Sequence, residues 1–163
     1  MEDPNQNELI FENTNGVTGS QIANQADHEE QYDELPPVKA PYLPPLSDRE
    51  QTRTYTLVLD LDETLIHYFE MGGVDGGGHF LIRPFAQKFL REMSQIYEIV
   101  IFTAAMQDYA DWVLDQLDPQ KYIKYRLYRQ HATHSGPVFI KDLSKIGRDL
   151  SRALIVDNVA ENF

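Results

Sequence analysis

The sequence of 163 residues contains no cysteine. A disulfide framework, a zinc–thiolate site and a cysteine nucleophile are therefore excluded. Long apolar runs are also lacking, since the longest one covers only residues 99–106, against the roughly 18 residues of a membrane-spanning helix. Basic residues are few, with 14 Lys and Arg against 26 Asp and Glu and a net charge of −12. We expect neither nucleic acid nor a membrane as a direct partner, because both require a basic face.

The acidity is concentrated in the first part of the chain. Residues 1–50 contain 11 acids and 2 bases, whereas residues 51–163 contain 15 acids and 12 bases. The first 50 residues also hold six of the nine prolines and few periodic apolar residues. Such a segment buries too little surface to offset its ordering entropy. We therefore predict a disordered acidic, proline-containing segment at 1–50 and a folded domain at 51–163.

The end of the acidic segment has a composition of its own. Prolines recur through residues 36–46 and favour an extended backbone. We expect residues 1 to about 38 to be disordered. The proline-rich stretch should instead lie along the domain as a strap, pinned by Tyr42, Leu43 and Leu46. The first basic residue is Lys39, and no basic region precedes an apolar one, so no secretory signal or Arg-rich presequence is expected. We expect a nuclear or cytoplasmic monomer.

From residue 55 onward, short apolar runs alternate with helical spacing. The runs predict buried strands, and a glycine-rich stretch at 71–78 predicts a flexible connector inside a hairpin. The predicted strands are 56–59, 98–102, 127–128, 138–140 and 153–156, with 66–69 and 79–82 forming the hairpin. Strands that alternate with helices indicate an α/β fold with a mostly parallel sheet.

Two helices are predicted between these strands. The first begins near Arg83-Pro84, and the second covers about 105–117. The apolar positions of the first helix are Phe85, Phe89, Leu90, Met93, Ile96 and Tyr97. Those of the second include Tyr109, Trp112, Val113 and Leu117. We expect the helical aromatic residues to pack in the core, and Met106 and Tyr109 are also candidates for a substrate pocket.

Polar residues follow three of the predicted strands. Asp60 comes after 56–59, Thr103 after 98–102 and Asp157 after 153–156. Ligands bind at the carboxyl ends of strands in parallel sheets, so these residues should meet at one edge. The residues expected there are Asp60, Asp62, Thr64, Thr103, Asp157 and Asn158. Clustered carboxylates need a cation, and hard oxygen ligands of this kind suit Mg²⁺.

Phosphoryl transfer fits this set of groups. A carboxylate beside a metal ion can attack phosphorus and form an aspartyl-phosphate. A second acid two residues away can protonate the leaving oxygen and later activate water. The reaction also needs positive or hydrogen-bonding groups for the phosphoryl oxygens, a task for which Thr103 and Lys141 have suitable chemistry.

The segment Asp60-Leu-Asp-Glu-Thr-Leu65 matches the DxDxT signature of haloacid-dehalogenase-superfamily phosphatases. Further matches follow in order at Arg83-Pro84, Phe102-Thr-Ala104, Tyr109-Ala-Asp111, Tyr128-Arg129, Ile140-Lys-Asp-Leu143, Gly147-Arg-Asp-Leu150 and Ile155-Val-Asp-Asn158. Over about residues 52–163 the chain resembles the phosphatases of the RNA polymerase II C-terminal domain, most closely their small phosphatase-like members. The resemblance implies a haloacid-dehalogenase-like (Rossmannoid) parallel sheet with flanking helices and a small strand insertion at about 118–140.

The same resemblance implies a role for each site residue. Asp60 would be the nucleophile and Asp62 the general acid and base, and both would serve Mg²⁺ with Asp157 and Asn158, Asp62 through its main-chain carbonyl. The residues implied to bind the substrate phosphate are Thr64, Thr103 and Lys141. The implied substrate is a protein that carries phosphoserine or phosphothreonine, the RNA polymerase II C-terminal domain being one candidate.

Two alternatives remain open from the sequence. Members of the resembled family continue beyond the Asp157-Asn158 motif, so we expect the domain at 51–163 to be incomplete at its C-terminus. The first alternative is therefore a catalytically weak or silent phosphopeptide-binding module of the same fold, like the receptor subunit of the mitochondrial import machinery. The second keeps the enzyme and changes its substrate to regulators of lipid metabolism.

Overall fold

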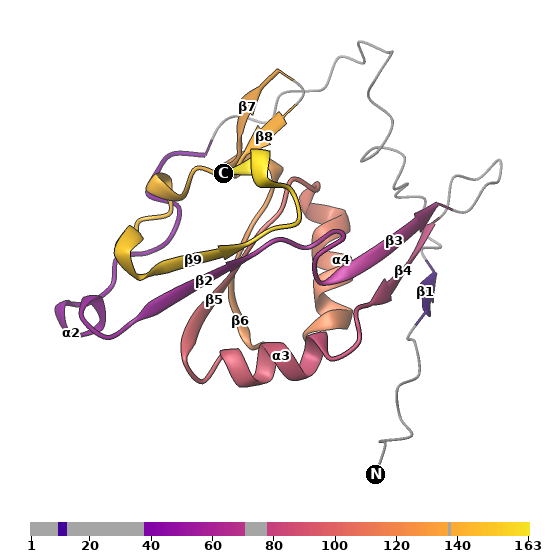
Figure 1. The fold of residues 1–163 in the computed structure, drawn as a ribbon, viewed down its shortest axis with the longest axis horizontal. Helices are drawn as coiled ribbons and strands as arrows, with labels where there is room; N and C mark the ends of the chain where they lie inside the picture. The colour runs from indigo at the N-terminus through magenta and orange to yellow at the C-terminus, as the bar shows by residue number, and fades with distance from the viewer. Residues whose placement is uncertain (1–9, 13–37, 71–77, 137) are drawn as a thin grey trace.

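The centre of the fold is a four-stranded parallel sheet, seen in a computed structural model that describes residues 10–12, 38–70, 78–136 and 138–163 (Figure 1). Its strands lie in the order β6-β5-β2-β9. The bounds are β2 Tyr55–Leu59, β5 Tyr97–Phe102, β6 Ile123–Leu127 and β9 Ala153–Val156. All three neighbouring pairs run parallel. The predicted α/β fold with a parallel sheet is confirmed.

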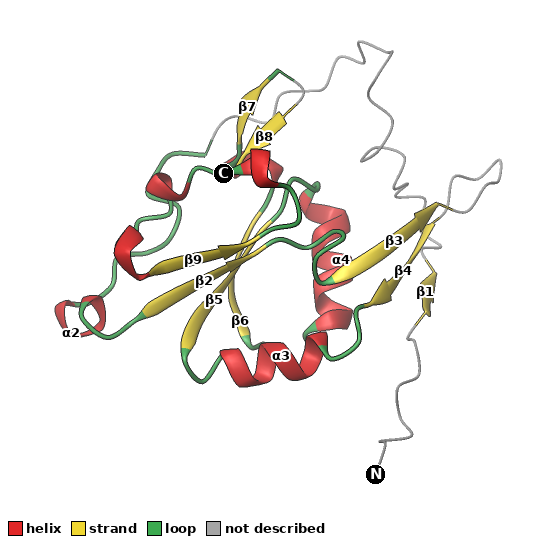
Figure 2. Ribbon diagram, in the orientation of Figure 1, coloured by secondary structure: helices red, strands yellow, loops and turns green. Residues whose placement is uncertain are grey.

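Both faces of this sheet are covered, which explains the continuous apolar runs of β2 and β5. Helices α3 (Ala86–Met93) and α4 (Gln107–Leu117) cover one face (Figure 2). The core on this side includes Leu57, Leu59, Ile99, Ile101, Leu90, Val113, Leu114 and Leu117. The second helix follows its predicted span closely, and both Tyr109 and Val113 are buried as expected.

The opposite face is covered by the strap at 38–46 together with residues 143–146. Leu43 is only 3% exposed and packs with Val58, Val100 and Ile146. The backbone N–H groups of Tyr42 and Leu43 donate to the carbonyls of Lys145 and Ile146, at 3.0 and 3.2 Å. Pinning through Tyr42 and Leu43 is therefore confirmed. Packed structure begins before the predicted boundary at residue 51, because the sheet needs a cover on this face.

A hairpin follows the first strand of the parallel sheet. Strands β3 (Ile66–Glu70) and β4 (Gly78–Ile82) pair antiparallel, as predicted, and the connector at 71–77 lies outside the described residues. Strand β1 (Ile10–Glu12) pairs with the other edge of β4. Residues 10–12 thus form a strand inside the segment predicted to be disordered, because the edge of β4 offers backbone partners. For residues 1–9 and 13–37 that prediction lies outside the described residues.

The first helix differs from its prediction. It begins at Ala86, because Phe85 has a positive φ of 67° and cannot continue a helix. Ala86 and Leu90 are buried, whereas Phe85, Phe89 and Ile96 are exposed, Phe85 by 63%. The expectation that Phe85 and Phe89 belong to the core is therefore wrong. Phe85 and Phe89 form one apolar row along the helix, and Ala86 and Leu90 form the neighbouring row. The spacing of apolar residues alone does not show which of the two rows faces the sheet.

The predicted strand insertion at 118–140 is also corrected. Residues 123–127 form β6, the edge strand of the parallel sheet, because its backbone pairs directly with β5. Only β7 (Thr133–Ser135) and β8 (Val138–Ile140) form a separate small sheet. The remaining short elements are α2 (Asp48–Gln51), η1 (Arg129–His131), η2 (Leu143–Lys145), η3 (Leu150–Arg152) and η4 (Ala160–Asn162). Among the described residues, no helix has the length and apolar character of a bilayer span.

Candidate functional site

The parallel register brings three strand ends to one edge of the sheet. Leu59 lies opposite Ile101 on β5 and opposite Val156 on β9. The N–H of Asp60 donates to the carbonyl of Val156 at 3.0 Å, and the N–H of Thr103 donates to that of Leu127 at 3.0 Å. Asp60, Thr103 and Asp157 therefore follow adjacent strands, as the sequence predicted.

Lys141 connects two of the carboxylates at this edge. Its Nζ lies 2.5 Å from Asp60 Oδ1 and 2.5 Å from Asp157 Oδ2. The lysine comes directly after β8 and is only 1% exposed, and its N–H donates to the carbonyl of Asn162 at 2.6 Å. Burial of such a charge is tolerated because both partners are anionic. Burial raises the pKa of Asp60, and Lys141 acts in the opposite direction.

Asp62 lies beside this group with different partners. Its Oδ1 accepts a hydrogen bond of 2.8 Å from the hydroxyl of Tyr109, and its Oδ2 lies 3.5 Å from Thr103 Oγ1. Burial raises the pKa of Asp62 to about 6; the hydrogen bond from Tyr109 opposes the rise and the charge of Asp60 adds to it. An acid with such a pKa can donate or accept a proton near neutral pH. The two carboxyl groups at 60 and 62 thus have distinct environments.

Thr64 and Asn158 complete the group of predicted residues. The Thr64 hydroxyl lies 3.0 Å from Asp60 Oδ2 and 3.3 Å from Asn158 Oδ1. The carboxylate of Asp157 also accepts a hydrogen bond of 2.8 Å from the N–H of Val159, which fixes its orientation. The seven predicted residues therefore form two hydrogen-bonded groups. One contains Asp60, Thr64, Lys141, Asp157 and Asn158, and the other contains Asp62 and Thr103. The Thr64 hydroxyl has a single proton, so it donates to either Asp60 Oδ2 or Asn158 Oδ1 at a time.

Sequence reasoning missed the contact of Tyr109 with Asp62. It placed Tyr109 in the core or in a substrate pocket, and the side chain is indeed buried and packs near Trp112. Its hydroxyl nevertheless reaches a carboxylate 47 positions earlier in the chain. A signal existed, because a buried tyrosine hydroxyl requires a hydrogen-bond partner.

The donor set at this edge fits Mg²⁺. Asp60 and Asp157 supply carboxylate oxygens, Asn158 supplies an amide oxygen, and the Thr64 hydroxyl lies near both Asp60 and Asn158. Hard oxygen ligands of this type are those that Mg²⁺ prefers. With Lys141, the two carboxylates leave one negative charge uncompensated. The described residues contain no group of three or more His, Cys, Asp or Glu side chains suited to a metal ion, so such a site depends on amide and main-chain oxygens too.

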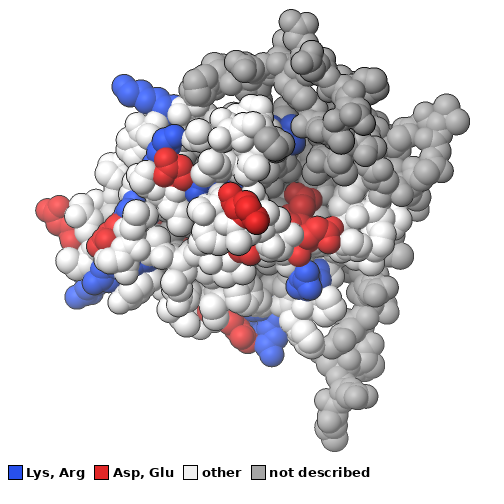
Figure 3. All heavy atoms as spheres, turned by 45° about the horizontal axis from the view of Figure 1, so that its top comes forward, with Lys and Arg blue, Asp and Glu red and all other residues white. Residues whose placement is uncertain are grey.

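Acidic side chains also gather on one face of the molecule, and Figure 3 shows them close together near its middle. An acidic surface repels a phosphate dianion. A phosphorylated substrate would therefore need positive charge beyond that of Lys141, which is already paired with Asp60 and Asp157.

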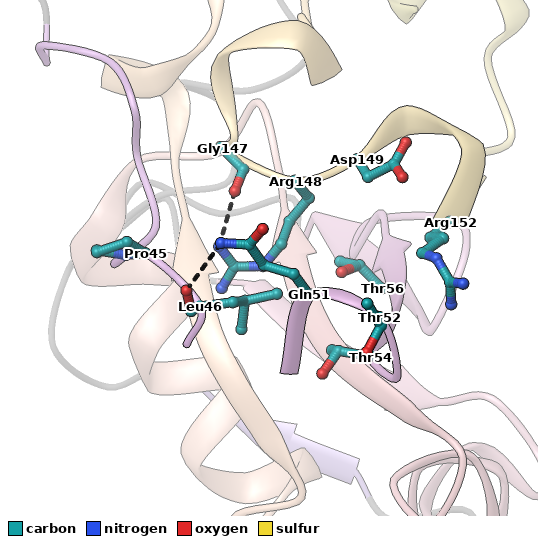
Figure 4. Close-up of a pocket in the computed structure, with 10 residues that line it drawn as sticks. All are labelled: Pro45, Leu46, Gln51, Thr52, Thr54, Thr56, Gly147, Arg148, Asp149 and Arg152. Atoms are coloured by element: carbon teal, nitrogen blue, oxygen red, sulfur yellow. Dashed lines mark hydrogen bonds between the residues drawn. The ribbon is translucent and has the colours of Figure 1, made fainter. Parts of the chain in front are cut away.

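A hollow of about 480 Å³ lies at the opposite end of the sheet (Figure 4). It lies at the amino ends of β2 and β9, and its lining includes Thr54, Thr56, Arg148 and Arg152. Arg148 is already paired with Glu98 at 2.6 Å and also donates to the carbonyl of Pro44 at 2.9 Å. None of the seven predicted site residues lines this hollow. Arg148 instead joins the strap, through Pro44, to Glu98 of β5.

The geometry can be compared with known proteins. Residues 55–163 match the family model described as NLI interacting factor-like phosphatase. A probable C-terminal domain small phosphatase of Dictyostelium discoideum is 41% identical over 121 residues, which cover 66% of this chain and 40% of that protein. The human carboxy-terminal domain RNA polymerase II polypeptide A small phosphatase 2 is 37% identical over 129 residues, with 71% and 47% covered. The chain thus spans less than half the length of these two relatives.

Solved structures support the fold. The fission yeast RNA polymerase II CTD phosphatase Fcp1-R271A bound to beryllium fluoride is similar with a TM-score of 0.55 and 22% identity, and the similarity covers 71% of this chain and 40% of that one. At this level of identity the likeness concerns the fold alone. Because the family model matches about two thirds of the sequence, including every predicted site residue, the chain belongs to the NLI interacting factor-like phosphatase family.

Proposed function

We propose that this chain is a Mg²⁺-dependent phosphatase that removes phosphate from phosphoserine or phosphothreonine in proteins through an aspartyl-phosphate. One observation carries the proposal. A carboxylate at Asp60, paired with Lys141, lies two residues from a second acid at Asp62 whose pKa is raised to about 6. A nucleophile and a proton donor at this spacing match the two tasks of the reaction.

In the first step a carboxylate oxygen of Asp60 attacks phosphorus, and the bond between phosphorus and the serine or threonine oxygen breaks. Asp62, protonated, gives its proton to the departing oxygen, which leaves as a hydroxyl. Lys141 hydrogen-bonds Asp60 and Thr103 lies 3.5 Å from Asp62, and in this proposal both would contact the phosphoryl oxygens. Stabilising charge on those oxygens is the main catalytic need of phosphoryl transfer.

In the second step Asp62, now ionised, takes a proton from water as the water oxygen attacks phosphorus. The bond between phosphorus and Asp60 breaks, and inorganic phosphate leaves. Asp60, the main-chain carbonyl of Asp62, Asp157 and Asn158 would hold Mg²⁺. When bound, Mg²⁺ supplies positive charge that lowers the repulsion between the carboxylates and the phosphate.

The names of two relatives support this choice of substrate class. Both include the RNA polymerase II C-terminal domain, so its phosphorylated repeat is the first substrate to test. The phosphatase activity, the nuclear or cytoplasmic location and the monomeric state remain predictions for this chain.

The test is phosphate release from a phosphoserine peptide of the polymerase repeat, with and without Mg²⁺. We compare the full chain with Asp60→Asn and with Asp108→Asn, an exposed acid at the start of α4. Asp60→Asn should lose at least about 10³-fold in kcat, since the nucleophile is removed. Asp108→Asn should retain the activity.

Circular dichroism of each variant checks that the fold is intact. Mg²⁺-independent release, or normal turnover by Asp60→Asn, would refute the mechanism. A folded wild-type chain that binds the phosphopeptide without releasing phosphate would favour the binding-module alternative.

A further inference from the structure

The loop that follows the two catalytic residues, Asp60 and Asp62, has an unfavourable backbone conformation. Glu63, which separates Asp62 from Thr64, has a φ of 61°. Residues other than glycine seldom adopt this left-handed region, because the side chain approaches the backbone too closely. Such a conformation persists only when the surrounding structure fixes it.

Hydrogen bonds fix the inner side of this loop. The N–H groups of Thr64, Leu65 and Ile66 all point toward the carbonyl of Leu61, at 3.3, 2.9 and 3.2 Å. The turn therefore closes on a single acceptor. The carbonyl groups of Glu63, Thr64 and Leu65 need hydrogen-bond donors from outside the turn.

Arg83 supplies those partners. Its Nε donates to the carbonyl of Thr64 at 2.6 Å, and its Nη2 donates to the carbonyl of Glu63 at 2.9 Å. Its backbone N–H donates to the carbonyl of Leu65 at 3.0 Å. One residue thus binds three successive carbonyls of the catalytic loop, although it follows β4 and lies about twenty positions away in sequence.

We infer that Arg83 is a positioning residue, which holds Asp62 and Thr64 in their reactive arrangement through the backbone of Glu63. This inference rests on the proposed phosphatase function for its kinetic consequence. The planar guanidinium donates two parallel hydrogen bonds from a fixed fork, which a lysine ammonium cannot reproduce. Because Arg83 directly follows β4, its hydrogen bonds also join the β3–β4 hairpin to the catalytic loop.

The first measurement is the steady-state kinetics of Arg83→Ala and Arg83→Lys with the phosphopeptide. A displacement of about 1 Å of a catalytic group can cost about 10²-fold, so we expect kcat to fall by about 10- to 100-fold in Arg83→Ala. KM should change by less than about twofold, because no substrate contact is removed. Arg83→Lys should recover only part of the loss. Arg91→Ala, which removes an exposed arginine of α3, is the matched control and should behave as wild type.

Chemical rescue separates positioning from a general loss of fold. Arg83 is exposed, so guanidinium ions in solution can enter the space that its side chain leaves. Millimolar guanidinium chloride should restore part of the kcat of Arg83→Ala, and sodium chloride at the same ionic strength should not. A loss confined to KM would instead indicate a substrate contact and would overturn the inference.

Hydrogen exchange tests the inference without any activity. In Arg83→Ala the amides of residues 61–66 should exchange faster, while those of β5 keep their wild-type protection. Unchanged amide exchange in residues 61–66 would refute the positioning role of Arg83, even if the wild-type chain proved to be a phosphatase. If Arg83→Ala exchanges faster there but the wild-type chain releases no phosphate, the positioning role of Arg83 is supported. That result would count only against the proposed function.

Discussion

Asp62 is the residue whose surroundings most affect the chemistry. Its side chain is largely removed from water, and burial raises its pKa to about 6. The pKa of Tyr109 is also raised, chiefly by burial and then by the nearby carboxylate of Asp62. The hydrogen bond between the two therefore has the tyrosine as its donor throughout the range in which Asp62 titrates.

Replacing Asp62 should make the protein more stable while it removes activity. Because the pKa of Asp62 is raised, the fold disfavours the ionised form, and this penalty is present above about pH 6. Asp62→Asn carries no charge and should gain about 1–3 kcal/mol in free energy of unfolding at pH 7, measured by urea titration with a chelator present.

The pH dependence provides the control for this prediction. Below the ordinary aspartate pKa of about 4, Asp62 is protonated in both the folded and the unfolded chain. The gain in Asp62→Asn should therefore shrink as the pH falls from 7 through 6 to 4. An equal gain at pH 7 and pH 4 would contradict an origin in the ionisation of Asp62.

Tyr109 should tune the pH at which Asp62 works. Its hydrogen bond lowers the pKa of Asp62, so Tyr109→Phe should raise that pKa further. The alkaline limb of the pH–rate profile should move to higher pH by less than about one unit, as expected for one hydrogen bond. Trp112→Phe, a neighbouring change in the same helix, should leave the limb in place. A shift toward lower pH in Tyr109→Phe would contradict the proposed general acid.

The site was more predictable than its supports. Asp60, Thr103 and Asp157 could be placed together because each follows an apolar strand, and parallel strands share a carboxyl edge. The contacts of Tyr109 and Arg83 could not be placed in this way, because each side chain reaches the catalytic loop from an element distant in sequence. Pairing of distant side chains depends on helix rotation and hairpin position, which periodicity does not determine.

Among the elements, the strap behaves as part of the domain. It closes the second face of the parallel sheet with Leu43, and Arg148 fixes its backbone at Pro44. Sequence composition assigned residues 1–50 to one disordered segment, because proline and acidic residues run through all of it, although the prolines at 36–46 already predicted a strap at its end. Burial of a single leucine is enough to divide that segment, and such an isolated position has no periodic signature.

Leu43→Ala should therefore destabilise the whole domain. The side chain is 3% exposed, and its removal leaves a cavity beside Val58 and Ile146. We expect a loss of about 2–4 kcal/mol in free energy of unfolding, measured by urea titration. Val38→Ala, at an exposed position of the same segment, should change it by less than about 0.5 kcal/mol. Equal effects of the two substitutions would mean that the strap is not packed in solution.

At the scale of the whole molecule, β9 is the last strand of the parallel sheet in the described part of the chain. This strand pairs with β2 on one side, and no described strand pairs with its other side. Leu154 and Val156 on this strand are 52% and 46% exposed. An apolar edge strand with free backbone groups is a template for pairing with another chain. The net charge of −12 opposes such contacts, so their balance depends on salt.

Association through β9 should appear as the protein is concentrated or the salt is raised. Added salt screens the repulsion between acidic chains but leaves the apolar edge unchanged. Light scattering of the wild-type chain should rise with concentration, and Leu154→Lys should suppress that rise, because a charged residue on an edge strand disfavours pairing. Leu150→Lys is the matched control, since Leu150 is 53% exposed but lies in η3, outside the strand. If both lysine variants suppress scattering equally, added charge and not the β9 edge accounts for the effect.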